Sequence, residues 1–294
     1  MKARIVMISS LIITSLFLMS CTPEEEGSVT RLYIAHAIDE TTPNTGAANE
    51  WFREELAAYL GIEVVHVEDI NHLIAIEALN AGHLDMVFSS AFNTVMAQEI
   101  VDIEIAGTLN HSEVNPIQTL FITAQPDIQT LVDLENRSFA FVSAASNTGF
   151  FFPLYHLANE LAVDPERMME SNYFFSVAYF SGSHETSING VNFGDYDAAA
   201  VISTVFNSLI ATGVIDGSNM HIIDSTPPAP DSSYIMRADL PEEIREGIRS
   251  FLLQLDSEDY YRDAWGIENL RFVAPNYETL AQIRSISERV GLSD

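Results

Sequence analysis

The chain has 294 residues, a single cysteine, and 13 basic against 42 acidic side chains, which gives a formal net charge of −29. So acidic a surface repels nucleic acid and anionic lipid headgroups, and one cysteine excludes a disulfide within the chain. The same charge opposes long-range attraction of an anionic ligand. Any anion site must therefore depend on short-range hydrogen-bond donors.

The first 29 residues are typical of an exported, lipid-anchored protein. A short basic segment at residues 1–4 precedes an apolar run at 5–19, which is too short for a comfortable membrane span. Residues 18–21 resemble a bacterial lipobox that ends at Cys21. We therefore predict a lipoprotein signal peptide at 1–20, lipidation of Cys21 and a tether at 21–29. The location would be the cell envelope, outside the cytoplasm. A plain secretory signal followed by a free thiol is the alternative.

Strands and helices alternate along the rest of the chain, a pattern typical of βαβ units and parallel sheets. Apolar runs predict strands at residues 31–37, 62–67, 84–88, 102–107, 117–123, 138–142, 173–177, 196–201 and 220–223. Helical spacing predicts helices at residues 47–60, 70–81, 91–98, 154–161, 184–191, 204–211, 241–255 and 277–290.

The number of predicted elements indicates an α/β protein with two lobes. We expect the first lobe to comprise residues 30–122 and 225–294, and the second to comprise residues 123–224. The chain would cross between them near residues 121–124 and again near 225–234. Two crossings make a hinge, and a ligand is expected in the cleft between the lobes.

A small polar turn in the predicted second lobe is the main candidate for binding. The apolar run at 138–142 is followed by Ser146, Asn147 and Thr148, and then by a predicted helix. The first N–H groups of a helix lack intrahelical partners and, with the helix dipole, favour an anion. The two hydroxyls and the amide add neutral donors. Ordinary N-capping explains the same residues and stays open at this point.

Five sequence blocks, in order, resemble the phosphate/phosphonate/phosphite-binding proteins of ABC importers. The resemblance runs from about residue 32 to 255, and no single block is decisive. The blocks are ALNAGHLD at 78–85, SNTGFFFP at 146–153, GSHETS at 182–187, GDYDAAA at 194–200, and STPPAP at 225–230 with RADLP at 237–241.

The resemblance implies a two-lobed periplasmic-binding-protein fold of type II. It also implies that a phosphate-like oxyanion is captured between the lobes and passed to an ABC permease and its ATPase. His184 matches a family histidine that contacts phosphoryl oxygens, and Ser90 lies where the family has a turn facing the ligand. His72 and Thr204 are further candidate contacts. We expect a monomer with no cofactor and no catalytic activity.

Two departures from the family pattern narrow the ligand. No aromatic residue stands near residues 116–117, and Ile202, Ser203 and Thr204 occupy a region where aminophosphonate binders carry acids. Aminophosphonates are therefore disfavoured, whereas phosphate, phosphite, simple phosphonates or another small anion stay open.

Other classes of function are weighed against this prediction. A lipoprotein that senses the same ligand for a signalling partner is one alternative. A hydrolase that uses Ser146 and His184 is another, but no G-x-S-x-G elbow surrounds Ser146. A metal site is not predicted, because His66 and His72 are six residues apart with no compact cluster of ligands around them.

Overall fold

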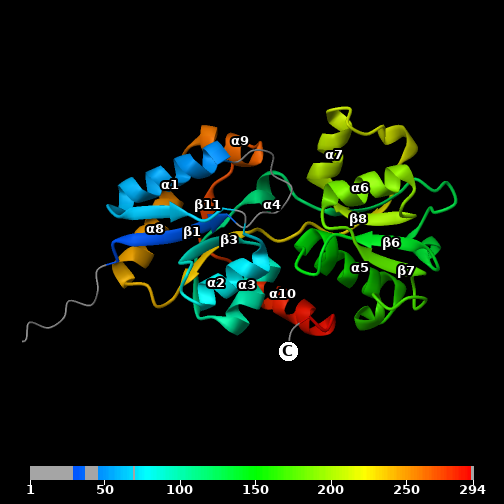
Figure 1. Cartoon of the computed structure of the whole chain (residues 1–294), viewed down its shortest axis with the longest axis horizontal. Coiled ribbons are helices and arrows are strands. Elements are labelled where there is room, and N and C mark those ends of the chain that lie inside the picture. The colour runs from blue at the N-terminus through cyan, green and yellow to red at the C-terminus, as the bar shows by residue number, and fades with distance from the viewer. Residues whose placement is uncertain (1–28, 37–45, 69, 293–294) are drawn as a thin grey trace, which may run out of the picture.

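The computed structural model describes residues 29–36, 46–68 and 70–292. Two lobes lie side by side, each built on its own β-sheet (Figure 1). The predicted signal peptide and Cys21 lie outside the described residues. Within the described ranges, no helix is both long and apolar enough to cross a membrane.

The first lobe contains a six-stranded sheet in the order β11-β4-β10-β3-β1-β2. Strand β10 is antiparallel to both β3 and β4, whereas β1 is parallel to β2 and β3. Strands β1 to β4 therefore all point the same way. The bounds are β1 Arg31–His36, β2 Glu63–His66, β3 Met86–Ser89, β4 Ile103–Leu109, β10 Ser233–Arg237 and β11 Phe272–Val273.

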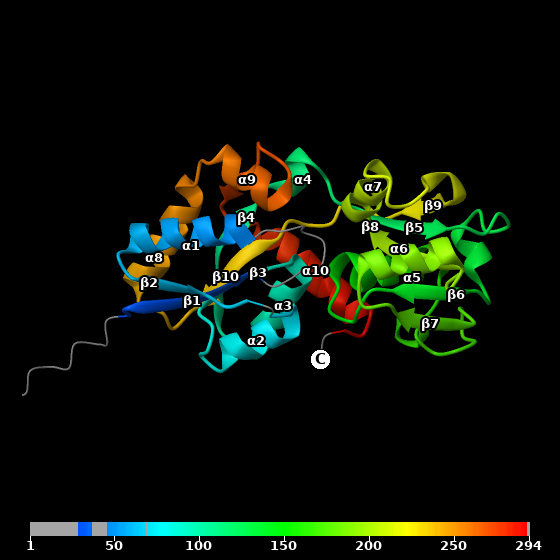
Figure 2. The same ribbon diagram turned by 45° about the horizontal axis from the view of Figure 1, so that its top comes forward.

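Within the described ranges, seven helices belong to the first lobe. Asn71 and Ser90 begin α2 and α3 by accepting a hydrogen bond from the N–H three residues on, as N-caps do. The bounds are α1 Gly46–Leu60, α2 His72–Asn80, α3 Ala91–Ile100, α4 His111–Val114, α8 Glu242–Gln254, α9 Glu258–Trp265 and α10 Tyr277–Arg289. Figure 2 shows α1, α8 and α9 on one face of the sheet and α2, α3 and α10 on the other.

The second lobe contains a five-stranded sheet in the order β7-β6-β8-β5-β9. Strand β6 is parallel to β7 and β8, and β5 is antiparallel to β8 and β9. The bounds are β5 Thr119–Thr123, β6 Ser138–Phe141, β7 Val177–Phe180, β8 Ala198–Ile202, β9 His221–Ser225, α5 Phe152–Leu161, α6 His184–Phe193 and α7 Ser203–Ala211.

The chain passes between the sheets twice, but the first passage is not where we predicted it. Both partners of β5 are strands of the second sheet, so the crossing lies between Leu109 and Thr119, ahead of the expected boundary at residue 122. The return lies between Ser225 and Ser233, as predicted, and leads into β10, a strand that was not predicted from the sequence. The strand predicted at 173–177 is also wrong, because β7 begins at Val177.

The lobes are in contact through α3 of the first lobe and residues 145–151 of the second. The ring of Phe92 on α3 stacks on Phe151 of the second lobe, with centroids 4.1 Å apart. The Asn93 amide donates to the Ala145 carbonyl at 3.3 Å. Residues 290–292, which follow α10, line a small pocket together with Phe150 and Leu154. One buried apolar cluster therefore continues from the first lobe into the second.

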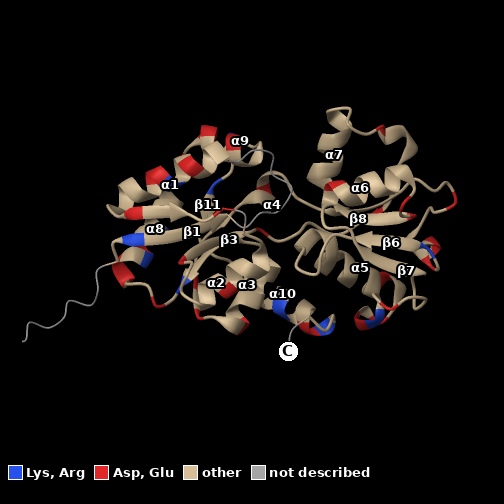
Figure 3. Ribbon diagram, viewed as in Figure 1, with Lys and Arg blue, Asp and Glu red and all other residues tan. Residues whose placement is uncertain are grey.

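Acidic side chains outnumber basic ones over the molecule (Figure 3). Acidic side chains are spread over both lobes, whereas the basic side chains are few and are mostly tied up in ion pairs. Arg245 and Arg249 on α8 both pair with Glu104 of β4, and Arg237 pairs with Asp85 and Asp239. These arginines fasten elements of the first lobe together and do not line the cavity between the lobes.

Candidate anion-binding site between the lobes

A cavity of about 550 Å³ lies between the lobes, at the ends of strands from both sheets. His36 ends β1, Ser90 follows β3, and His111 follows β4, while Thr148 follows β6 and Thr204 follows β8. In open α/β sheets, ligands bind outside the carboxyl ends of the parallel strands. The topology of both lobes therefore directs loop residues toward this one cavity.

The predicted anion turn begins a short π-helix, Asn147–Phe151, which runs directly into α5. Ser146 is its N-cap, and its hydroxyl accepts from the Gly149 N–H at 3.0 Å. The N–H groups of Asn147 and Thr148 therefore lie at the N-terminus of a continuous helical segment. The positive end of the helix dipole lies at the same place. Insertions of π-helix occur frequently at functional sites.

Thr148 is held from two sides. Its carbonyl accepts from the Thr119 hydroxyl at 2.6 Å, and its own hydroxyl oxygen is 3.3 Å from His184 Nε2. The Ile202 N–H donates to His184 Nδ1 at 3.0 Å, so this imidazole carries its proton on Nε2. His184 Nε2 therefore donates to the Thr148 hydroxyl oxygen. The Thr148 hydroxyl proton takes no part in this hydrogen bond. It can point into the cavity that Thr148 lines.

The structure brings four of the seven predicted ligand-binding residues to the cavity: Ser90, Asn147, Thr148 and Thr204. Ser146 is buried beneath the turn as its cap, and His184 is buried behind Thr148 with 2 % of its surface exposed. His72 is the first residue of α2 and does not line the cavity. The predicted direct contacts of Ser146, His184 and His72 with a ligand are therefore not supported by their positions.

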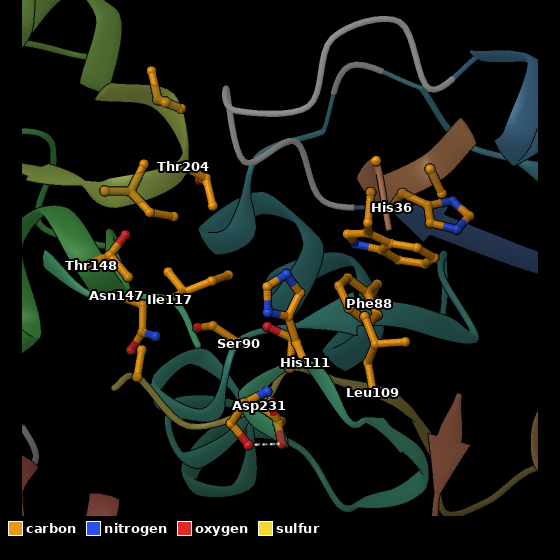
Figure 4. A pocket seen from close by; sticks show the side chains of 18 of the residues that line it. His36, Phe88, Ser90, Leu109, His111, Ile117, Asn147, Thr148, Thr204 and Asp231 are labelled. Atoms are coloured by element: carbon orange, nitrogen blue, oxygen red, sulfur yellow. Dashed lines mark hydrogen bonds between the residues drawn. The ribbon is translucent and has the colours of Figure 1, made fainter. Parts of the chain in front are cut away.

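His111 is a cavity residue that the sequence reading missed. Its side chain is 8 % exposed, and Nδ1 is among the few buried side-chain atoms of the described residues that lack a hydrogen-bond partner. Figure 4 shows the imidazole in the middle of the cavity, with Asn147 and Thr148 to one side. Burial lowers the pKa of His111 below its ordinary value, so the ring is neutral at pH 7.

Asp231 lies beside His111 in the second crossing. Its carboxylate accepts from the backbone N–H and the hydroxyl of Ser112, at 2.5 and 2.7 Å. Burial nevertheless raises the pKa of Asp231 above its ordinary value. The pair fastens the two chain crossings to each other, since Ser112 belongs to the first and Asp231 to the second.

His36 belongs to a second group of rings on the first lobe. Its Nε2 is hydrogen-bonded to the Tyr234 hydroxyl, and its Nδ1 is 3.1 Å from His66 Nε2. Burial and the neighbouring His66 lower the pKa of His36 to about 3. Phe88 and Trp265, with ring centroids 5.7 Å apart, complete this wall of the cavity.

The sequence did contain a signal for these histidines. His36 ends a predicted strand, and His111 lies a few residues beyond another, where ligand-binding side chains of α/β sheets are expected. For Phe88 and Trp265 no local signal exists, because aromatic residues in strands and helices are more often core. In the described part of the chain, no three His, Cys, Asp or Glu side chains come together in a way that could hold a metal ion.

Comparison with known proteins places the chain among transport proteins. The sequence profile of the family described as "ABC transporter, phosphonate, periplasmic substrate-binding protein" matches residues 36–278. A probable ABC transporter phosphite binding protein, PhnD1 of Prochlorococcus marinus (strain MIT 9301), is 28 % identical over 215 residues, which cover 70 % of each chain.

Solved structures show the same fold at low sequence identity. The structure of PhnD1 from P. marinus in complex with methylphosphonate has a TM-score of 0.73 at 21 % identity, covering 90 % of this chain and 99 % of that one. A binding protein component of an ABC phosphonate transporter from Pseudomonas aeruginosa has a TM-score of 0.67 at 15 % identity, with coverage of 89 % and 95 %. The expected α/β fold of two-lobed, type II periplasmic binding proteins is confirmed.

Proposed function

The chain belongs to the family of periplasmic substrate-binding proteins of phosphonate ABC transporters, and on that premise we propose that it holds the phosphoryl head of its ligand at the Asn147–Thr148 turn. The main supporting observation is a chain of hydrogen bonds that runs from Ile202 through His184 to Thr148. Two hydrogen bonds fix the imidazole and the hydroxyl that lines the cavity. Donors fixed before binding lose little entropy when an anion arrives.

The ligand would be a small tetrahedral oxyanion such as phosphite, phosphate or a phosphonate. Thr148 donates its hydroxyl proton, and the N–H groups of Asn147 and Thr148 donate from the helical head. Ser90 and His111 approach from the first lobe and Thr204 from α7. Because His184 is neutral and buried, it acts on the ligand through Thr148 and adds no positive charge.

Calorimetry with phosphite, phosphate, methylphosphonate and sulfate tests this proposal. Four to six hydrogen bonds to an ionised ligand, each worth about 1.5–3 kcal/mol, are enough for a micromolar affinity of about −8 kcal/mol after association costs. Binding of a phosphorus oxyanion with sulfate rejected would support the proposed turn. If none of the phosphorus oxyanions binds at millimolar concentration, the proposed function is wrong.

The geometry around Ser146 argues against the alternative of a serine hydrolase. The Ser146 hydroxyl accepts from Gly149 N–H, and His184 Nε2 is bonded to Thr148 instead. No nucleophile–base pair is therefore formed between Ser146 and His184. We expect an active-serine probe to leave the protein unlabelled, and stoichiometric labelling at Ser146 would contradict this.

The protein acts outside the cytoplasm as the binding component of an importer, and its partners are a permease and an ATPase. We propose in addition that Cys21 carries the lipid anchor and that the protein is a monomer. Changing Cys21 to Ala should release the protein from the membrane fraction, with Ser20→Ala as the control. A mutant that stays in the membrane fraction would place the anchor elsewhere.

We also propose that ligand closes the two lobes about their two crossings. The donors lie on both sides of the cavity, so the ligand contacts both lobes only when they approach each other. Small-angle scattering should give a smaller radius of gyration at saturating ligand. An unchanged curve, with binding verified by calorimetry in the same sample, would count against closure.

A further inference from the structure

We propose that the cavity contains an apolar subsite across from the anion turn, which takes an organic substituent on the phosphorus atom. Its ligand would then be an alkyl- or arylphosphonate larger than methylphosphonate. The inference rests on the proposed function, because the subsite is useful only if the phosphoryl head is seated at Thr148. The subsite is formed by Phe88, Leu109, Ala264 and Trp265 of the first lobe and by Val205 and Leu209 of the second.

The position of this subsite follows from the close-up of the cavity. Figure 4 shows Asn147, Thr148 and Thr204 on one side and Phe88, Leu109 and His36 on the other. A ligand that places its anionic end at Thr148 and spans the cavity would therefore direct its substituent toward Phe88 and Leu109.

The aromatic wall is fixed by its own packing. Phe88 contacts Tyr234 and Trp265, with ring centroids 5.1 and 5.7 Å apart, and Trp265 contacts Tyr260 at 5.5 Å. Tyr234 and Tyr260 are both almost fully buried. The shape of this first-lobe wall is therefore set before a ligand binds.

The histidine at the ring wall offers little to a charged or polar substituent. Both ring nitrogens of His36 are already hydrogen-bonded, and its low pKa keeps it neutral. Three carboxylates line the cavity, and one of them, Asp263, is next to Ala264 of the subsite in the chain. Asp231 accepts two hydrogen bonds from Ser112, Asp263 lies 3.6 Å from the Arg262 guanidinium, and Glu185 is exposed at the start of α6.

The size of the cavity points the same way. Its volume of about 550 Å³ lies inside the range of about 300–1,000 Å³ found for clefts that bury drug-sized ligands. At about 30 Å³ per molecule, it has room for on the order of fifteen to twenty waters. In the lobe arrangement of this structure, a bare oxyanion of five non-hydrogen atoms would fill a small part of the cavity and leave Leu109, Trp265 and Val205 in contact with water.

A ligand series measures the subsite directly. We would titrate the purified protein with phosphite, methylphosphonate, n-propylphosphonate, n-butylphosphonate and phenylphosphonate, and with 2-aminoethylphosphonate as the charged match for n-propylphosphonate. Each methylene buried in an apolar site should raise the affinity about fourfold. The three that separate butyl- from methylphosphonate should together give about ten- to sixtyfold.

The outcomes separate this inference from the proposed function. If phosphite and methylphosphonate bind but affinity stays flat or falls with chain length, the apolar subsite is wrong and the proposed function stands. Tighter binding of 2-aminoethylphosphonate than of n-propylphosphonate would also overturn the subsite, in favour of carboxylates that hold an ammonium group. If no phosphorus oxyanion binds, the proposed function fails first.

The two tryptophans of the chain offer a matched pair of variants. Trp265 lines the cavity, whereas Trp51 on α1 stacks on Tyr260, with ring centroids 5.1 Å apart, and lies outside it. Trp265→Leu should lower the ratio of butylphosphonate to phosphite affinity about tenfold, and Trp51→Leu should leave that ratio unchanged. Equal ratios in both variants would contradict the subsite.

A second variant avoids the risk that Trp265→Leu does not fold. Val205→Thr keeps the shape of a side chain that is 6 % exposed and adds one hydroxyl to the wall. It should lower the same affinity ratio about three- to tenfold. In a Trp51→Phe background, Trp265 emission should also shift on addition of butylphosphonate and change less with phosphite. Unchanged ratios and identical emission with both ligands would overturn the proposal.

Discussion

The two walls of the cavity are built from different chemistry. The wall on the second lobe consists of helix N-termini, hydroxyls and an amide, held by Ser146, Thr119 and His184. The wall on the first lobe consists largely of rings that contact one another, with Tyr234 at their centre. On the proposals above, the second lobe would supply most of the donors to the head group. The first lobe would supply the ring wall of the subsite, to which Val205 and Leu209 of the second lobe also contribute.

The donor wall depends on backbone geometry, and the ring wall depends on side-chain packing. A Cβ built at Gly149 would lie 2.4 Å from Val142 Cγ2 and 2.7 Å from Ser146 Oγ, so only glycine fits under the turn. In the ring wall, Phe52 stacks on Tyr234 with centroids 5.1 Å apart. We therefore expect single backbone changes to damage the first wall most, and ring changes to alter selectivity in the second.

The largest effect is expected at Gly149. Gly149→Ala must displace Val142 or the Ser146 cap, with an overpacking cost of about 1–3 kcal/mol in unfolding free energy. Affinity for the phosphoryl head should fall more than a hundredfold, as measured by calorimetry. Gly107→Ala is the control, since its Cβ would make ordinary contacts of 3.4 Å with Leu252. Wild-type affinity in Gly149→Ala would contradict the importance of the turn.

Thr148→Ala should come next, with a loss of about tenfold to a hundredfold in affinity. The change removes one donor to a charged ligand and leaves the helical head in place, which corresponds to about 1.5–3 kcal/mol. Thr148→Ser keeps the hydroxyl and should recover most of the loss. If Thr148→Ala and the wild type bind the same oxyanion equally, this turn is not the binding site.

His184→Ala should act on stability as well as on binding. Removing a side chain that only contacts ligand in an open cleft would leave the free energy of unfolding unchanged. His184, however, is buried. Its removal leaves the Ile202 N–H without its partner, at a cost of about 1–3 kcal/mol. Affinity should fall about tenfold, because the Thr148 hydroxyl is no longer oriented. A variant with lowered affinity but unchanged thermal stability would contradict the supporting role.

The last expected effect concerns the pH dependence of the ring wall. The pKa of His36 is about 3 in the folded chain and about 6.5 when unfolded. The unfolded state therefore binds more protons between these values, and unfolding free energy falls as the pH drops from about 6.5, by at most about 1.4 kcal/mol per unit. Burial lowers the pKa of His66 and His111 in the same direction.

Chemical denaturation between pH 7 and pH 5 measures this slope. His36→Gln keeps a neutral group that can form hydrogen bonds and should show a shallower slope than the wild type. His83→Gln is a suitable control, because His83 is an exposed residue outside the ring wall. If the unfolding free energy depends on pH equally in the wild type and in His36→Gln, then the ring wall tolerates a protonated His36. The neutrality of the wall would then not set its selectivity.

Local sequence patterns were sufficient for most of the fold. Hydrophobic periodicity predicted most of the alternating strands and helices and the polar turn at Ser146, because these depend on residues a few positions apart. It also predicted two passages between the lobes, but placed the first of them too late in the chain. Local patterns were not sufficient for β10, which is inserted between β3 and β4, or for α9 and β11. Residues 233–237 enter the sheet because of partners more than a hundred residues away.

The candidate site, like the fold, was predicted from the sequence only in part. The sequence alone determined the turn at Asn147 and Thr148, since a strand, a small polar turn and a helix head are local features. Only the tertiary structure placed His184 behind Thr148, removed His72 from the cavity, and brought Phe88, Leu109 and Trp265 together. Those three side chains converge because of strand order and long-range packing, which no pattern of neighbouring residues encodes.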